Sequence, residues 1–157
     1  MCSSRIASRW MRIGQRVAAA ITVLWTLAGC AIGLAPSTVR SVVEAKFAAV
    51  NRHSIEQIEA LYSVDAVVTA PDFCSPRRGR EDIRRTYRAL FDAYTDISAD
   101  VEEYLVQGDR VAVRLTVRSR LPGRSFEVPI MNFFTVKNGL IVSDEGMFDT
   151  RGRKCSP

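Results

Sequence analysis

The stretch "RVAVRLTVRSRLPGRSFEVPIMNFFTVKNGLIVSDEGMF", Arg110–Phe148, decides the fold of this chain. Residues 110–120 alternate between apolar and polar side chains, which predicts a strand with one buried face. Residues 125–136 are apolar on both faces and are expected to form a central strand, and Asn138-Gly139 is a strong signal for a tight hairpin. With a strand at 97–107 before this stretch and a last strand after the hairpin, the C-terminal half predicts an antiparallel meander.

The residues before the meander have mainly helical periodicity. Apolar residues recur at spacings of three and four in three stretches, each of which predicts a helix. The first is 38–52, the second begins after the capping residue Ser54, and the third is 80–94. The stretch "DAVVTAP", 65–71, indicates a short strand, and the prolines and glycine of 71–79 indicate a loop. Helices that precede a meander favour an α+β domain. We expect a strongly curved antiparallel sheet wrapped around three helices, with a pocket at its open end.

The N-terminus has the features of an export leader. Residues 1–29 carry four arginines and no acid, and an uncharged run extends from Val17 to Ala35. A signal peptide has basic residues first, then apolar residues and then small residues, and this segment has the same order. The uncharged run is also just long enough to span a bilayer. An uncleaved signal anchor and ordinary cleaved secretion therefore stay open as alternatives.

The residues Leu27-Ala28-Gly29-Cys30 resemble the lipobox of bacterial lipoproteins, in which the cysteine is lipidated and becomes the new N-terminus. This resemblance implies an exported protein that is held on the bacterial cell membrane by lipid on Cys30. A start at Met11 in place of Met1 also stays open. The predicted divisions are, in order, a signal peptide, a tether, a folded domain and a C-terminal tail: 1–29, 30–37, 38–150 and 151–157.

Charge and histidine content argue against two kinds of site. The chain has 22 basic and 17 acidic residues, but four arginines lie in the leader, which leaves 22 − 4 = 18 basic residues. Nucleic-acid binding needs basic residues clustered on the folded domain, so we do not expect it. His53 is the single histidine and is expected at a helix end. Since a lone histidine is a poor metal site, no metal or cofactor is expected.

Two cysteines remain after the leader and the lipid site are set aside. Cys2 would leave with the leader, so Cys74 and Cys155 are the cysteines of the folded part. In an exported protein, two such cysteines favour a disulfide. A catalytic cysteine is the alternative, but no histidine is placed to activate it.

Four motifs in order carry a family resemblance over about 39–150: "LYSVDAVVTAP", "PRRGREDIRRTY", "VPIMNFFTVKNGLIV" and Phe148-Asp149. The chain resembles the nuclear transport factor 2-like superfamily, in its SnoaL-like and ketosteroid-isomerase-like branch. The resemblance implies a cone-shaped α+β fold, an apolar pocket and a homodimer. Its known functions range from isomerase and cyclase to plain binding and assembly.

The residues that would perform isomerase chemistry are missing at the matching positions. The isomerase uses an aspartate base, a tyrosine and a protonated aspartate. The corresponding residues here are Ala70 for the base, Met131 for the acid and Lys46 or Phe47 for the tyrosine. The cyclase branch uses an aspartate near the end of the sheet, which Asp149 matches best, with Asp144 and Glu145 nearby. The alternative for Asp149 is a structural role, in which it ends a strand and forms a hydrogen bond with the nearby backbone or with Arg151.

The leading hypothesis is a cell-envelope lipoprotein whose domain binds a small apolar ligand or a protein partner without isomerase chemistry. A cyclase-like or isomerase-like enzyme that uses Asp149 is one alternative, and a dimerising assembly module is another. Asn132 is expected either to face the pocket or to pair on the sheet. The residues expected to line the pocket are aromatic or sulfur-containing: Phe47, Tyr62, Tyr87, Phe91, Met131 and Phe133.

Overall fold

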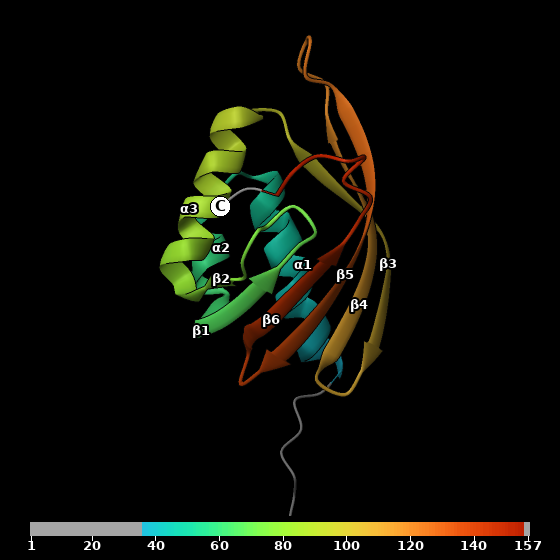
Figure 1. The fold of residues 1–157 in the computed structure, drawn as a ribbon. Helices are drawn as coiled ribbons and strands as arrows, with labels where there is room; N and C mark the ends of the chain where they lie inside the picture. The colour runs from blue at the N-terminus through green and yellow to red at the C-terminus, as the bar shows by residue number, and fades with distance from the viewer. Residues whose placement is uncertain (1–35, 156–157) are drawn as a thin grey trace, which may run out of the picture. The chain divides into compact units, whose positions relative to one another are not determined.

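A computed structural model describes residues 36–155, which all belong to one unit, Ile32–Pro157 (Figure 1). The predicted leader and Cys30 lie outside the described residues. No helix among the described residues is long and apolar enough to cross a membrane. The elements in chain order are α1 Pro36–Asn51, α2 Ile55–Ala60, β1 Tyr62–Thr69, β2 Arg77–Arg78, α3 Gly79–Ala93, β3 Ser98–Gln107, β4 Arg110–Ser119, β5 Phe126–Lys137 and β6 Leu140–Met147.

The six strands form one sheet in the order β2-β1-β6-β5-β4-β3, and its strongly curved inner face holds the helices (Figure 1). Strands β3 to β6 pair as an antiparallel meander, as the sequence predicts. The expected antiparallel sheet also contains one parallel pair, which β1 forms with β6. The α+β fold with a curved sheet around three helices is confirmed.

Alternation along β4 and β5 sorts side chains between the inner and outer faces of the sheet. Val111, Val113 and Leu115 are buried on the inner face, as their period of two predicts. On β5 the even-numbered residues share that face, because Asn132 pairs with Val113 and Phe134 pairs with Val111. The inner face of the sheet and the apolar stripe of α1 form one hydrophobic core.

The start of β1 differs from the prediction. The periodicity after Ser54 places Tyr62 on a helix, but α2 ends at Ala60 and Tyr62 begins β1. Six residues form less than two helical turns, and the Tyr62 backbone instead pairs with Ile141 in the sheet. The side chain of Tyr62 is completely buried between the helices and the sheet.

The helix α3 depends on a glycine at its first residue. Gly79 has a φ angle of +74°, and a Cβ at this position would lie 2.9 Å from the carbonyl oxygen of Val64. This close approach brings α3 directly against β1, and only glycine accommodates both the conformation and the contact. Gly79 therefore sets the position of α3 over the inner face of the sheet.

Candidate ligand-binding cavity

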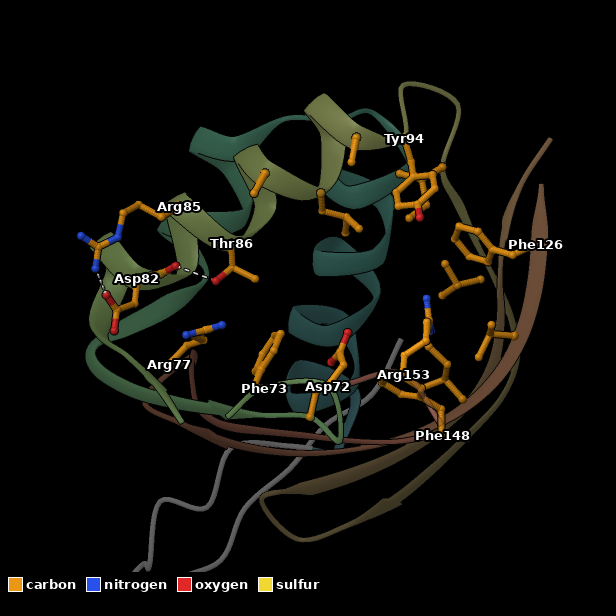
Figure 2. Close-up of a pocket in the computed structure, with 18 of the residues that line it drawn as sticks. Asp72, Phe73, Arg77, Asp82, Arg85, Thr86, Tyr94, Phe126, Phe148 and Arg153 are labelled. Carbon is orange, nitrogen blue, oxygen red and sulfur yellow. Dashed lines mark hydrogen bonds and ion pairs between the residues drawn. The ribbon is translucent and has the colours of Figure 1, made fainter. Parts of the chain in front are cut away.

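A cavity of about 920 Å³ opens between α3 and the inner face of the sheet (Figure 2). Its walls come from the loop between β1 and β2, one side of α3, the inner faces of β4 and β5, and the chain after β6. The lining residues are Ala70, Asp72, Phe73, Ser75, Pro76, Arg77, Asp82, Arg85, Thr86, Ala89, Leu90, Ala93, Tyr94, Ile97, Val117, Phe126, Val128, Ile130, Phe148 and Arg153.

Apolar side chains form the sheet side and one end of the cavity. Phe126, Val128 and Ile130 alternate along β5 and all face inward. Tyr94, which follows α3, packs edge-to-face on Phe126 with ring centroids 5.0 Å apart. Aromatic pairs of this geometry are favourable beyond the area that they bury, so Tyr94 and Phe126 form an aromatic wall at this end of the cavity.

Charged side chains gather at the opposite end of the cavity (Figure 2). Asp82 in the first turn of α3 accepts hydrogen bonds from the backbone N–H of Arg78 and from the guanidinium of Arg85. These two contacts, the backbone one first, lower the pKa of Asp82 below its usual range. The guanidinium of Arg77 lies over the ring of Phe73, 4.6 Å from its centroid.

The C-terminal tail reaches the cavity because a disulfide holds it there. Cys155 is bonded to Cys74 in the loop between β1 and β2, with the two Cα atoms 4.9 Å apart. The pairing therefore agrees with the disulfide that the sequence favours. The bond brings Arg153 to the cavity, and Figure 2 shows its side chain pointing inward.

A buried polar cluster lies deeper in the domain than the lining residues. The carboxylate of Asp144 on β6 accepts hydrogen bonds of 2.6 Å from the hydroxyl of Tyr62 and from the side-chain amide of Asn132. The ammonium group of Lys46 on α1 lies 3.8 Å from the same carboxylate. Asp144 is 2% exposed and Lys46 is 5% exposed, so this ion pair is shielded from water.

Aromatic rings complete the surroundings of the Lys46 ammonium. It lies 4.1 Å from the ring centroid of Phe47 and 5.2 Å from that of Phe134. Burial alone would lower the pKa of Lys46, but Tyr87 and Asp144 outweigh it and the pKa is raised. Burial, together with the neighbouring charge of Asp144, raises the pKa of Tyr62 well above its usual value. The cluster therefore holds a protonated lysine and a neutral phenol at neutral pH.

None of the six aromatic or sulfur-containing residues expected to line the pocket is among the cavity residues described above. Phe47, Tyr62 and Phe91 are core residues, and Tyr87 is partly buried against that core. Met131 and Phe133 belong to the outer face, because Met131 pairs with Arg114 and Met147, and Phe133 pairs with Glu145. The sequence analysis assigns Met131 and Phe133 to the inner face of β5, but the even-numbered residues of this strand lie there. A shift of one residue along a strand moves a side chain to the other face of the sheet.

The residues at the isomerase positions occupy three different environments. Ala70 lines the cavity and offers only a methyl group. Lys46 is paired with Asp144 in the core, and Met131 lies on the outer face, with Ile130 and Asn132 beside it facing inward. Asp149 is exposed, is not among the lining residues, and accepts a hydrogen bond from the backbone N–H of Arg151. This is the structural role that the sequence also allowed for Asp149.

Sequence reasoning missed most of the cavity for identifiable reasons. The loop 70–77 has no periodicity that predicts which side chains turn inward. The side of α3 that faces the cavity carries Asp82 and Thr86, and a hydrophobic pattern assigns such residues to solvent. One usable signal was present, because Val128 and Ile130 share the face of the buried Phe134 on β5. Among the described residues no group of histidine, cysteine or acidic side chains is arranged to hold a metal ion.

Comparison with known proteins identifies the domain. The sequence model of the SnoaL-like domain family matches residues 43–144. The chain belongs to the SnoaL-like domain family. The resemblance noted from the sequence is thereby confirmed for the fold and the family. No curated protein matches this sequence.

Solved structures share the SnoaL-like fold. A "putative polyketide cyclase" from Sinorhizobium meliloti is 26% identical over 72% of this chain and 99% of that chain, with a TM-score of 0.60. IdmH from Streptomyces antibioticus, named in the same words, is 24% identical over 72% and 93%, with a TM-score of 0.65. TerC, crystallised with polyporic acid, is 21% identical over 73% and 93%, with a TM-score of 0.66. The matched region makes up almost all of the first of these chains.

Proposed function

We propose that this SnoaL-like domain binds a small, largely apolar molecule in the cavity between α3 and the sheet. The observation that carries the proposal is the cavity itself. Its volume of about 920 Å³ lies at the upper end of the range of small-molecule sites, which is roughly 300–1,000 Å³. Its lining also fits such a site, because it combines apolar walls with a few charged groups.

The positions matched to isomerase residues do not bring an acid and a base to this cavity. Ala70 cannot accept a proton, and the inward-facing residues of β5 at the cavity are Phe126, Val128 and Ile130. Asp82 is engaged by Arg85 and by the backbone of α3. These contacts support binding without isomerase chemistry. The kinship with polyketide cyclases favours a ligand with fused or linked rings, for which the aromatic wall of Tyr94 and Phe126 is suited.

The protein acts at the cell envelope in this proposal, held by lipid on Cys30. The support is the order of the leader, with basic residues, an apolar run and "LAGC" directly before the domain. Each acyl methylene that enters the bilayer contributes roughly 0.8 kcal/mol, so two or three chains are enough to hold a folded domain on the membrane. A ligand site on a lipid-anchored domain would meet apolar molecules that move in or near the membrane.

The outer face of the sheet is proposed as a dimer surface. Leu105 is 60% exposed and Met147 is 55% exposed. Their strand pairing places Ala112, Met131 and Phe133 on the same face. Ala112, Met131 and Phe133 are half-buried, so Leu105 and Met147 are the exposed members of this group. Exposed apolar side chains that share one face are a feature of interaction sites. A second copy of the domain would bury them, which is a role compatible with ligand binding on the inner face.

A fluorescence titration tests the binding proposal. N-phenyl-1-naphthylamine, a neutral apolar dye, is titrated into the domain Ile32–Pro157 and into two variants. Ala93→Trp places an indole in the cavity from α3 and is expected to abolish the fluorescence rise. Ala60→Trp adds the same group to α2, outside the cavity lining, and is expected to leave binding unchanged. Equal binding by all three proteins, or binding by none of them, would reject the proposal.

A further inference from the structure

The C-terminal tail is tied to the mouth of the cavity by one covalent bond. Its described hydrogen bonds are local, because both the backbone N–H and the Nε of Arg153 donate to the carbonyl oxygen of Thr150. The disulfide between Cys74 and Cys155 joins the tail to the loop before β2. Chain termini without such a tie are usually poorly ordered. The disulfide therefore decides where Arg153 lies.

The side chain of Arg153 points into the cavity from the tail, opposite α3 (Figure 2). Apolar groups of Phe126, Ile130 and Phe148 line the cavity with it. Arg153 is exposed, so its guanidinium is accessible to an anionic group on a molecule whose apolar part lies against these walls. This is the arrangement that recognises a molecule with an apolar body and one acidic group.

The other charges of the cavity are engaged with neighbours on their own side. Arg85 forms an ion pair with Asp82, and Arg77 lies over Phe73. Asp72 also lines the cavity, so the charged lining residues are three arginines and two aspartates in all. This balance leaves one positive charge in excess, which favours an anionic ligand over a neutral or cationic one.

We propose that the cavity is specific for apolar molecules that carry a carboxylate or another anionic group, and that Arg153 binds this group. The Cys74–Cys155 disulfide positions Arg153 for the contact. This inference rests on the proposed ligand-binding function and adds the class of ligand. A guanidinium binds a carboxylate or sulfonate through charge-assisted hydrogen bonds, which are about twice as strong as neutral ones.

Two dyes that share one scaffold test the inference. N-phenyl-1-naphthylamine is neutral, and 1-anilinonaphthalene-8-sulfonate adds a sulfonate to the same rings. We expect Arg153→Gln to weaken sulfonate-dye binding about tenfold or more, since a hydrogen bond to a charged group is lost. Its affinity for the neutral dye should fall much less than its affinity for the sulfonate dye, because the neutral dye has no group for the guanidinium to bind. The control Arg151→Gln removes the same charge from the same tail at a residue outside the cavity lining, and it should change neither dye.

The double variant Cys74→Ser/Cys155→Ser tests the positioning role of the disulfide. It retains every charge, and we expect it to lose sulfonate-dye affinity selectively, as Arg153→Gln does. Thermal melting confirms that each variant is folded at the temperature of the titration.

The outcomes separate this inference from the proposed function. Neutral dye that binds wild type but not Ala93→Trp supports the binding function. If the neutral dye then binds while Arg153→Gln leaves the sulfonate dye unchanged, the anion site at Arg153 is wrong and the cavity function stands. Equal losses of affinity for the sulfonate dye in Arg153→Gln and Arg151→Gln would also overturn the anion site at Arg153, because they would reflect the general charge of the tail. If neither dye binds wild type, both the cavity function and the anion site fail.

Discussion

The ion pair between Lys46 and Asp144 is the residue-scale feature that sequence reasoning did not find. Both residues were named from the sequence, Lys46 as one residue at a missing catalytic position and Asp144 as a neighbour of Asp149. They lie almost a hundred positions apart in the chain, and the pairing depends on α1 packing across β6. No local pattern encodes that contact. The sequence predicts that Asn132 faces the pocket or pairs on the sheet; in the structure it is paired within the sheet, and its side chain faces inward and donates a hydrogen bond to Asp144.

Removal of the carboxylate at Asp144 should destabilise the domain strongly. Asp144→Asn leaves the Lys46 ammonium buried without its counter-charge, and losing one partner of a buried pair costs about 3–5 kcal/mol. The matched control Asp149→Asn alters an exposed carboxylate, and we expect it to cost less than about 1 kcal/mol. Urea denaturation of the three proteins at pH 7 measures the two differences. Similar costs for both variants would show that Asp144 does not balance a buried charge.

The same variant has a definite pH dependence. In the wild type the pKa of Lys46 is raised, so its contribution is fully present below the pKa of an unfolded lysine and is lost as pH rises through the folded pKa. Without Asp144, one of the groups that oppose the effect of burial is lost, so the pKa of Lys46 should be lower than in the wild type. The folded variant then releases the Lys46 proton at a lower pH than the folded wild type, and the difference in stability between the two proteins shrinks as pH rises. The deficit of Asp144→Asn should therefore be smaller at pH 9.5 than at pH 7, and a constant deficit would contradict this account.

At the scale of elements, the sequence predicted the strands and helices well and their faces less well. The boundaries of α1, α3, β3, β4 and β5 fall within about two residues of the expected ranges, because the periodicity in those stretches is strong. The short apolar run that contains Tyr62 fits either period, so the pattern predicts a helix where the structure has a strand. Residues 125–136 are apolar on both faces, so the pattern does not decide whether Met131 and Phe133 lie on the buried face.

The junction of β2 and α3 provides an element-scale prediction. Gly79→Ala should destabilise the domain by about 1–3 kcal/mol, since it adds both a strained φ angle and a contact of 2.9 Å with the Val64 carbonyl. Gly108→Ala is the control, because Gly108 also has a positive φ angle but has open space around it. The difference between the two variants in urea denaturation isolates the contact between α3 and β1. An equal cost would mean that α3 tolerates a small displacement.

At the scale of the whole molecule, the outer face of the sheet predicts association. Leu105→Asp should convert a dimer of the domain Ile32–Pro157 into a monomer, because it places a charge in a buried apolar interface. Val64→Asp is the control, since Val64 is 75% exposed but lies on β1, outside the group on β3 to β6. Light scattering during size-exclusion chromatography measures the molar mass. A wild-type monomer at high concentration would contradict the dimer.

The proposed location of the protein at the membrane is tested on the full chain. Production in a bacterium with a lipoprotein-processing pathway should yield a membrane-bound protein that begins at Cys30 and carries acyl chains. Cys30→Ser should abolish the lipid mass and the cleavage. Mass spectrometry of the N-terminal peptide measures both. An intact leader would favour the signal anchor, and an unmodified N-terminus after cleavage would favour ordinary secretion.

A crystal structure of the domain Ile32–Pro157 grown with N-phenyl-1-naphthylamine shows whether the cavity between α3 and β5 holds an apolar molecule. We expect electron density for the dye against Leu90, Phe126 and Ile130, with the rings beside the Tyr94 wall. Dye bound only on the outer face, near Leu105 and Met147, or a cavity that holds only water at saturating dye, would contradict it.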